Sequence, residues 1–206
     1  ATAEKLRGGF YTPEPIAAFI LKWGINGSSD YEILEPSCGD GVFLEQLKEN
    51  NHKFKSVTAI EFDEIEAEKA EKIKLDNKTV INTDFHLYCN ETTKRFDLVV
   101  GNPPYIRYQY FQEEQQNEAI KVFKRAKLKY SKLTNAWVSF VVGSSLLLKE
   151  KGKIGFVIPA ELLQVSYAQQ LREFLAHFYN KINIISFEKL VFLDIQQEVV
   201  LLLCEK

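Results

Sequence analysis

The chain has 206 residues, a length that accommodates one compact domain with a buried core. Hydrophobic residues make up 46% of it and charged residues 26%, which excludes disordered, collagen-like and coiled-coil chains. The balance of 26 Lys and Arg residues against 28 Asp and Glu residues leaves a formal charge of −2, so any contact with nucleic acid has to be local.

Cysteines, histidines and apolar segments exclude further classes of protein. The three cysteines form no C-x-x-C pair and the three histidines lack metal-ligand spacing, so we expect neither disulfide bonds nor a metal site. The longest charge-free stretch, 133–148, is too short and too polar to span a bilayer. The N-terminus shows no secretory signal. We therefore expect a cytoplasmic protein without a membrane segment.

The first half of the chain alternates predicted helices and strands. Thr12 and Pro13 mark a helix start, with Thr12 as the cap and Pro13 in the first helical position. The predicted elements are a helix over 13–24, strands over 31–34, 56–60 and 79–81, and helices from 42 and over 64–74. This order predicts βαβ units and therefore parallel strands.

The second half continues the alternation after a polar stretch over 107–132. The predicted elements are strands over 96–100 and 153–158, helices over 133–150 and 167–178, and final strands over 182–187 and 198–204. The last two strands are joined by a short connection and are predicted to pair antiparallel. We expect one domain with a doubly wound α/β architecture and a mostly parallel sheet of about seven strands.

Polar residues follow the strands of this predicted sheet, where ligands of such folds bind. A loop with two glycines over 35–41 follows the first strand, and Glu61 ends the second strand, placed to accept both hydroxyls of a ribose. Asp84 and Phe85 follow the third strand and offer a carboxylate to an adenine amino group and an aromatic face to its ring. A plain turn, a solvated strand end and an ordinary loop are the alternative interpretations.

The segment from Asn102 to Tyr105 carries the most specific signal. Two consecutive prolines remove two N–H donors, so backbone carbonyls and the Asn102 amide oxygen form an array of acceptors that suits a planar amino group. Two acceptors on the hydrogens of an aromatic amine draw its nitrogen toward a tetrahedral, reactive form. Tyr105 would then stack on the base, and rate would come from positioning and preorganised electrostatics.

Together these motifs resemble the N6-adenine DNA methyltransferases of restriction-modification systems, in the gamma class whose cofactor motifs precede an NPPY catalytic motif. The resemblance covers nearly the whole chain. The matching segments are 10–13, 35–43, 61, 84–85 and 102–105, followed by 135–148, 152–159, 171–175 and 191–192. It implies a Rossmann-like class I S-adenosylmethionine-dependent methyltransferase fold, with the last strand antiparallel, and S-adenosylmethionine as cofactor.

The resemblance also implies roles for individual residues. Those assigned to the cofactor are Thr12, Glu35, Ser37, Cys38, Gly39, Gly41, Glu61, Asp84, Phe85 and Asn102. Those assigned to catalysis are Asn102, Pro103, Pro104, Tyr105 and Phe192, of which Tyr105 and Phe192 would grip an adenine flipped out of duplex DNA. By the same resemblance residues 1–206 form the catalytic domain, and the DNA target-recognition domain lies outside this chain.

The implied partners are DNA and an associated restriction endonuclease. The dense basic segment after the catalytic motif offers phosphate contacts through Lys121, Lys124, Arg125, Lys127 and Lys129. A solvated helix that balances neighbouring glutamates is the alternative interpretation of that segment. Four residues just after the motif, namely Arg107, Tyr108, Tyr110 and Phe111, are predicted to form a mobile lid around the flipped base.

Two other functions remain open from sequence. Protein-glutamine N5-methyltransferases of the release-factor type also carry Asn-Pro-Pro-Tyr, but their cofactor loop usually reads Asp-Leu-Gly-x-Gly-x-Gly, which differs from the Glu-Pro-x-Cys-Gly-x-Gly found here. A catalytically idle cofactor-binding module is the second alternative, and the intact catalytic motif argues against it.

Overall fold

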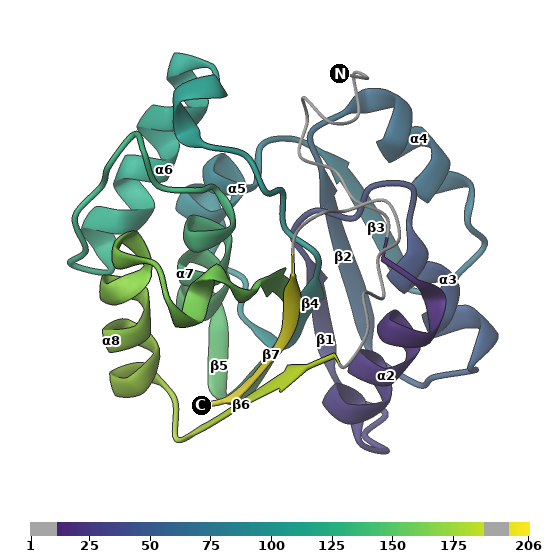
Figure 1. Cartoon of the computed structure of the whole chain (residues 1–206). Coiled ribbons are helices and arrows are strands. Elements are labelled where there is room, and N and C mark those ends of the chain that lie inside the picture. Colours follow the sequence, from purple (N-terminus) through teal and green to yellow (C-terminus); the bar gives the residue numbers. More distant parts are fainter. Residues whose placement is uncertain (1–11, 188–197) are drawn as a thin grey trace.

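A computed structural model describes residues 12–187 and 198–206 of the chain. Figure 1 shows a central sheet with helices on both of its faces. The strands are β1 Glu32–Glu35, β2 Ser56–Glu61, β3 Lys78–Asn82, β4 Phe96–Gly101, β5 Leu148–Pro159, β6 Lys181–Ser186 and β7 Val199–Glu205. The helices are α2 Glu14–Ile25, α3 Val42–Glu49, α4 Glu64–Lys72, α5 Phe85–Glu91, α6 Glu113–Arg125, α7 Trp137–Leu146 and α8 Gln169–Phe178.

The strands form one seven-stranded sheet in the order β3-β2-β1-β4-β5-β7-β6. The first five strands in this order pair in parallel, whereas β7 runs antiparallel between β5 and β6. The strand order reverses between β1 and β4, which makes their carboxyl ends the switch point where ligands bind in such sheets. The predicted doubly wound sheet and its antiparallel last strand are confirmed.

Two hydrophobic cores fill the space between the sheet and its helices. Because side chains alternate along a strand, neighbours on β1 face opposite cores: Leu34 packs with α5, α6, α7 and α8, and Ile33 packs with α2 and α3. Figure 1 shows the same division, with α2, α3 and α4 on one side of the sheet and α5 to α8 on the other. Burial on both faces explains why the central strands read as continuous apolar runs.

Several predicted element boundaries were wrong. Pro13, rather than Thr12, occupies the N-cap of α2, and the helix begins at Glu14. The predicted helix over 133–150 divides into α7 and the start of β5, because Leu148 joins the sheet opposite Phe96. Length and apolar character alone do not separate a buried helix from a buried strand. The polar stretch over 107–132 contains the helix α6, in agreement with the alternative interpretation of its basic segment as part of a solvated helix.

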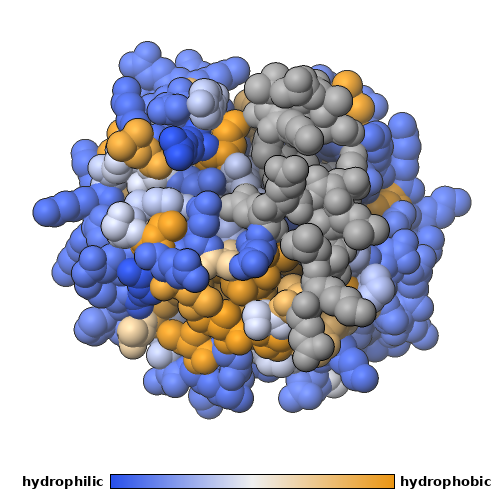
Figure 2. All heavy atoms as spheres, in the orientation of Figure 1, coloured by the Kyte–Doolittle hydropathy of each residue, from blue (hydrophilic) through white to orange (hydrophobic). Residues whose placement is uncertain are grey.

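One edge of the sheet exposes apolar side chains. On β6, Ile182, Ile184 and Ile185 are 37%, 39% and 36% exposed. Figure 2 shows hydrophobic atoms gathered over the lower centre of this face, where Figure 1 places β6.

In the described ranges no helix is long and apolar enough to cross a membrane.

Candidate functional site

A cavity of about 420 Å³ opens at the carboxyl ends of β1, β2 and β4. The residues that line it come from the loops after these strands, from the start of α5 and from the segment that leads into α6. Of the residues predicted for the site, those that line this cavity are Thr12, Glu35, Ser37, Cys38, Gly39, Glu61, Asp84, Phe85, Asn102 and Pro104. The fold thus brings together side chains that are far apart in sequence.

Three of the predicted site residues do not line the cavity, and a fourth cannot be compared with it. Gly41, Pro103 and Tyr105 adjoin lining residues but do not themselves line the cavity. Phe192 lies outside the described residues, so its position beside the site stays a prediction.

The loop after β1 is held in a turn that two left-handed glycines permit. Gly39 has φ +53° and Gly41 has φ +102°, values that residues with a Cβ rarely adopt. The Cys38 N–H donates to Ile60 O at 2.9 Å, which ties the loop to β2. The Gly39 N–H donates to Glu61 Oε2 at 2.9 Å, so the loop amide contacts the carboxylate at the end of β2 directly.

The cavity is strongly acidic. Glu35 is only 2% exposed, and its Oε2 has no hydrogen-bond partner among the described residues. Burial raises the pKa of Glu35 well above its ordinary value, and the charges of Glu61 and Asp40 add to this effect. Burial likewise raises the pKa of Glu61. The hydrogen bonds that its carboxylate accepts from backbone amides lower this pKa but do not cancel the effect of burial. Such a cluster of carboxyl groups suits a cationic ligand, which would offset their mutual repulsion.

Cys38 lies in this acidic surrounding without the features of a nucleophile. Burial raises the pKa of the Cys38 thiol, and the carboxylates of Glu35 and Glu61 raise it further. A thiol under these conditions stays protonated, so Cys38 serves as a small packing residue.

Asp84 is the N-cap and Phe85 the first residue of α5, so the alternative interpretation of this segment as an ordinary loop is wrong. The Asp84 carboxylate caps this helix, because its Oδ1 accepts from the Leu87 N–H at 3.0 Å. Its Oδ2 accepts from Gln115 Nε2 at 3.3 Å. Phe85 is 2% exposed and stacks on Phe140 with ring centroids 4.8 Å apart.

Sequence reasoning missed several residues that line the cavity. Phe140 lies within an apolar run that indicates only a core position, and Gln115 lies in the polar stretch, on α6, where no ligand contact was predicted. Phe62 follows Glu61 directly and is 54% exposed, an unusual environment for a phenylalanine. An aromatic residue directly after a strand-ending carboxylate is a sequence signal that could have marked this position.

The segment from Asn102 to Tyr105 follows β4 and contacts the loop after β1. Tyr105 Oη donates to Asn102 Oδ1 at 2.6 Å and lies 3.1 Å from Val157 O. Ser37 Oγ donates to Asn102 O at 3.3 Å, which links the loop after β1 to the loop after β4. Burial raises the pKa of the Tyr105 hydroxyl, so it stays protonated as the donor toward Asn102.

The predicted lid was wrong for Tyr108. Its side chain is fully buried and packs edge-on against Phe111 and Phe123, with ring centroids 5.6 Å and 6.2 Å away. Tyr110, 69% exposed, and Phe111 do line the cavity. Apolar packing under α6 therefore anchors the centre of the segment that was expected to move.

The basic segment divides between exposed and anchored side chains. Arg125 Nη1 donates to Cys89 O at 2.8 Å and to Asn90 Oδ1 at 3.2 Å, so its guanidinium holds α6 against α5. Lys121 pairs with Glu118 on the same helix. Lys124, Lys127 and Lys129 are exposed.

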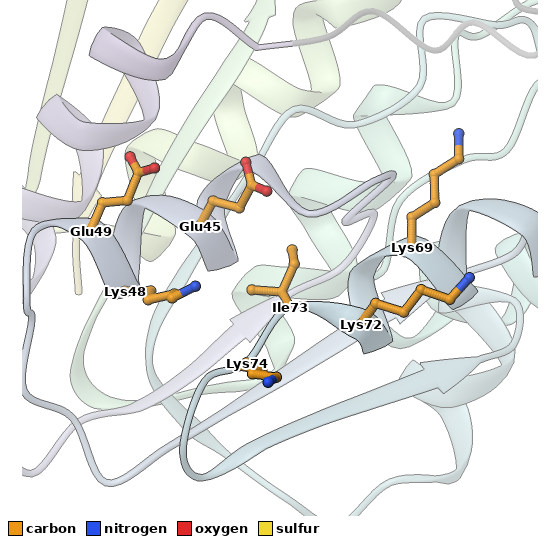
Figure 3. Close-up of a pocket in the computed structure, with 7 residues that line it drawn as sticks. All are labelled: Glu45, Lys48, Glu49, Lys69, Lys72, Ile73 and Lys74. Atoms are coloured by element: carbon orange, nitrogen blue, oxygen red, sulfur yellow. The ribbon is translucent and has the colours of Figure 1, made fainter.

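A second cavity of about 410 Å³ lies between α3 and α4, away from the predicted residues. Figure 3 shows charged side chains from both helices around it. Its lining residues are Glu45, Lys48, Glu49, Lys69, Lys72, Ile73 and Lys74. All except Ile73 are exposed, so this hollow lacks the buried polar groups found at the switch point.

Across the described part of the chain, no group of three or more His, Cys, Asp or Glu residues could hold a metal ion.

Comparison with known proteins identifies relatives of this chain. The family model for the Eco57I restriction-modification methylase matches residues 15–192. Type II methyltransferase M.AccI from Acinetobacter calcoaceticus is 30% identical over 203 residues, which cover 95% of this chain and 36% of the relative. Type II methyltransferase M.HincII from Haemophilus influenzae is 30% identical and covers 89% and 33%. The chain thus spans about a third of the length of these curated relatives.

Solved structures show the same fold at low sequence identity. The methyltransferase subunit of a type I restriction-modification system from Streptococcus thermophilus has a TM-score of 0.78 at 18% identity, over 96% of this chain and 44% of that one. A class I S-adenosylmethionine-dependent methyltransferase from Listeria monocytogenes has a TM-score of 0.74 at 18% identity, over 94% and 58%. The predicted class I methyltransferase fold is confirmed.

Proposed function

The chain belongs to the Eco57I restriction-modification methylase family, and on that premise we propose that it transfers a methyl group from S-adenosylmethionine to the N6 amino group of adenine in DNA. One observation carries the proposal: Asn102, the centre of the amine-binding motif, lines the same cavity as the buried carboxyl groups of Glu35 and Glu61. An amino group held by Asn102 would therefore lie beside a ligand held by these carboxylates.

The cavity fits the proposed cofactor in charge and in unsatisfied polar atoms. S-Adenosylmethionine carries a sulfonium and an ammonium group, and the unpartnered Oε2 of buried Glu35 is an acceptor for such a cation. We place the methionine end near Thr12, Glu35 and Ser37, and the ribose on Glu61. The adenine would lie by Asp84 and Phe85. When bound, the cofactor supplies an electrophilic methyl group.

The residues of the chain orient the acceptor nitrogen in this proposal. Asn102 Oδ1 and the Pro103 carbonyl accept the two amino hydrogens, which concentrates the lone pair on the nitrogen opposite them. The Tyr105 hydroxyl, 2.6 Å from Asn102 Oδ1, orients the Asn102 amide. Pro104 keeps the loop rigid, so little reorganisation is needed as charge develops. Phe192 is proposed as an aromatic contact of the flipped base.

DNA is the proposed substrate, and a restriction endonuclease is the proposed associated enzyme. The Escherichia coli relative RM.Eco57I, 30% identical over 47% of this chain and 10% of its own length, is a type II restriction enzyme and methyltransferase. The chain spans about a third of the length of its curated relatives, and we propose that it carries the catalytic domain.

The test separates cofactor binding from transfer. We expect Asn102→Ala to leave the calorimetric Kd for S-adenosylmethionine within about twofold, while transfer of labelled methyl groups into adenine-containing DNA falls by roughly a thousandfold. Nucleoside mass spectrometry identifies the product as N6-methyladenine. Asn180→Ala, at an exposed position before β6, is the matched control and should change neither quantity. Equal loss of binding and transfer in Asn102→Ala would refute the role of Asn102 in holding the amino group.

A further inference from the structure

His86 is a buried polar residue that none of the predicted motifs uses. It is completely buried on α5, two residues after Asp84. Its ring packs edge-on against Phe140 at a centroid distance of 5.0 Å and lies 5.7 Å from the ring of Phe85. Both aromatic residues line the cavity, so His86 stands directly behind the wall proposed to hold the cofactor adenine.

Each imidazole nitrogen of His86 faces one polar group. Nε2 is hydrogen-bonded to Ser139 Oγ on α7 at 2.6 Å. Nδ1 makes no hydrogen bond among the described residues, and it lies 3.4 Å from Asp84 Oδ1, within ion-pair distance. Ser139 Oγ is also 2.9 Å from Ala136 O, which can only accept. His86 thus connects the interior of α7 with a carboxylate of the cavity wall.

The hydrogen bond between Ser139 and His86 sets the tautomer of the imidazole ring. The Ser139 hydroxyl has one hydrogen and two acceptors within reach, and His86 Nε2 at 2.6 Å is closer than Ala136 O at 2.9 Å. When the hydroxyl donates to Nε2, the hydrogen of the ring lies on Nδ1. The other tautomer would turn the Nδ1 lone pair toward the Asp84 carboxylate at 3.4 Å, which is repulsive. The favourable arrangement therefore directs Nδ1–H toward Asp84.

Asp84 is ionised under this arrangement. Burial by itself raises the pKa of the Asp84 carboxyl, but the contacts with His86, Leu87 N–H and Gln115 outweigh burial and lower it. Oδ1 receives Leu87 N–H and faces His86, whereas Oδ2 receives only Gln115 among the described contacts. A carboxylate oxygen accepts about two hydrogens, so Oδ2 retains capacity for a ligand on the side that lines the cavity.

We propose that His86 is a positioning residue, whose Nδ1–H orients the Asp84 carboxylate so that Oδ2 accepts a hydrogen from the adenine amino group of the cofactor. The proposal rests on the function proposed above and adds to it a residue that selects adenine over a base with a 6-oxo group. Ser139 fixes the ring of His86 from the opposite side. His86 itself stays behind the wall and touches no ligand.

Two substitutions at His86 distinguish the role of Nδ1 from the role of Nε2. In His86→Asn the side-chain amide stands near the position of Nδ1 and can still donate to Asp84. In His86→Gln the amide reaches toward Ser139 and leaves no donor opposite Asp84. We expect His86→Gln to weaken the calorimetric Kd for S-adenosylhomocysteine by about tenfold, and His86→Asn to restore most of that loss.

The ligand S-inosylhomocysteine gives the readout that a purely structural role would not move. It carries an oxo group in place of the adenine amino group, so Asp84 has no amino hydrogen to accept. We expect the unaltered protein to prefer the adenosyl ligand, and His86→Gln to lose about tenfold of that preference because its Kd for the inosyl ligand stays nearly constant. Equal weakening for both ligands, or equal behaviour of the two variants, would overturn the proposal.

A measurement on the unaltered protein keeps the proposal testable if a variant unfolds. In protein labelled with nitrogen-15 at histidine, we expect the His86 resonance to report a protonated Nδ1. An unprotonated Nδ1 would refute the donor role assigned here. Absence of any S-adenosylhomocysteine binding by the unaltered chain would instead count against the proposed function, which keeps the two failures distinct.

Discussion

Glu35 shows how a single residue couples the cavity to stability. Its carboxyl pKa is raised above the ordinary 4.5, by burial first and then by Glu61 and Asp40, so the native state holds a proton that the unfolded chain releases. Stability therefore falls as pH rises from about 4.5 toward the raised pKa. We expect Glu35→Gln to raise Tm by several degrees at pH 8 and by less at pH 5, measured by circular dichroism. The exposed Glu45→Gln on α3 is the control, and equal gains at both pH values for Glu35→Gln would contradict the assignment.

The junction between the cofactor loop and α3 depends on one glycine. Gly41 caps α3 with φ +102°, and a Cβ there would lie 2.4 Å from Ile73 Cδ1. Gly39 also has a positive φ, but a Cβ on it would meet open space. We expect Gly41→Ala to lower the free energy of unfolding by about 2–3 kcal/mol and Gly39→Ala by about 1 kcal/mol, measured by urea denaturation. Equal losses of stability in the two variants would show that the close approach of Gly41 to Ile73 adds nothing to the cost of the substitution.

Charge on the whole molecule is nearly balanced, so the proposed DNA binding has to come from local groups. We expect the joint replacement of Lys124, Lys127 and Lys129 by Ala to weaken the salt dependence of duplex DNA binding. The slope of log K against the logarithm of the salt concentration should become smaller in magnitude by about 2–3, measured by fluorescence anisotropy. Arg125→Ala should leave that slope unchanged and lower Tm, because its guanidinium is bound to Cys89 O and Asn90. An unchanged slope in the triple variant would remove this segment from the DNA-binding surface.

Much of the fold was predictable because its signals are local. Glu61 and Asn102 follow apolar runs bounded by turn residues, and such runs identify strands without tertiary information. The boundary between α7 and β5 was not predictable, since Leu148 belongs to β5 only through its pairing with Phe96. The lid prediction failed at Tyr108 for a related reason: adjacency in sequence does not show whether an aromatic ring turns toward solvent or toward the core.

Residue types and their spacing alone specify a doubly wound α/β fold and the chemistry of the catalytic motif, because turn residues, strand periodicity and the donor inventory of Asn-Pro-Pro-Tyr are properties of short segments. Tertiary packing alone decides the rest of the site. It buries Glu35 with no partner for Oε2 among residues 12–187 and 198–206, turns the Tyr105 hydroxyl onto Asn102, and sets His86 between Asp84 and Ser139. These contacts join residues on separate elements, and burial gives them energies that no local pattern encodes.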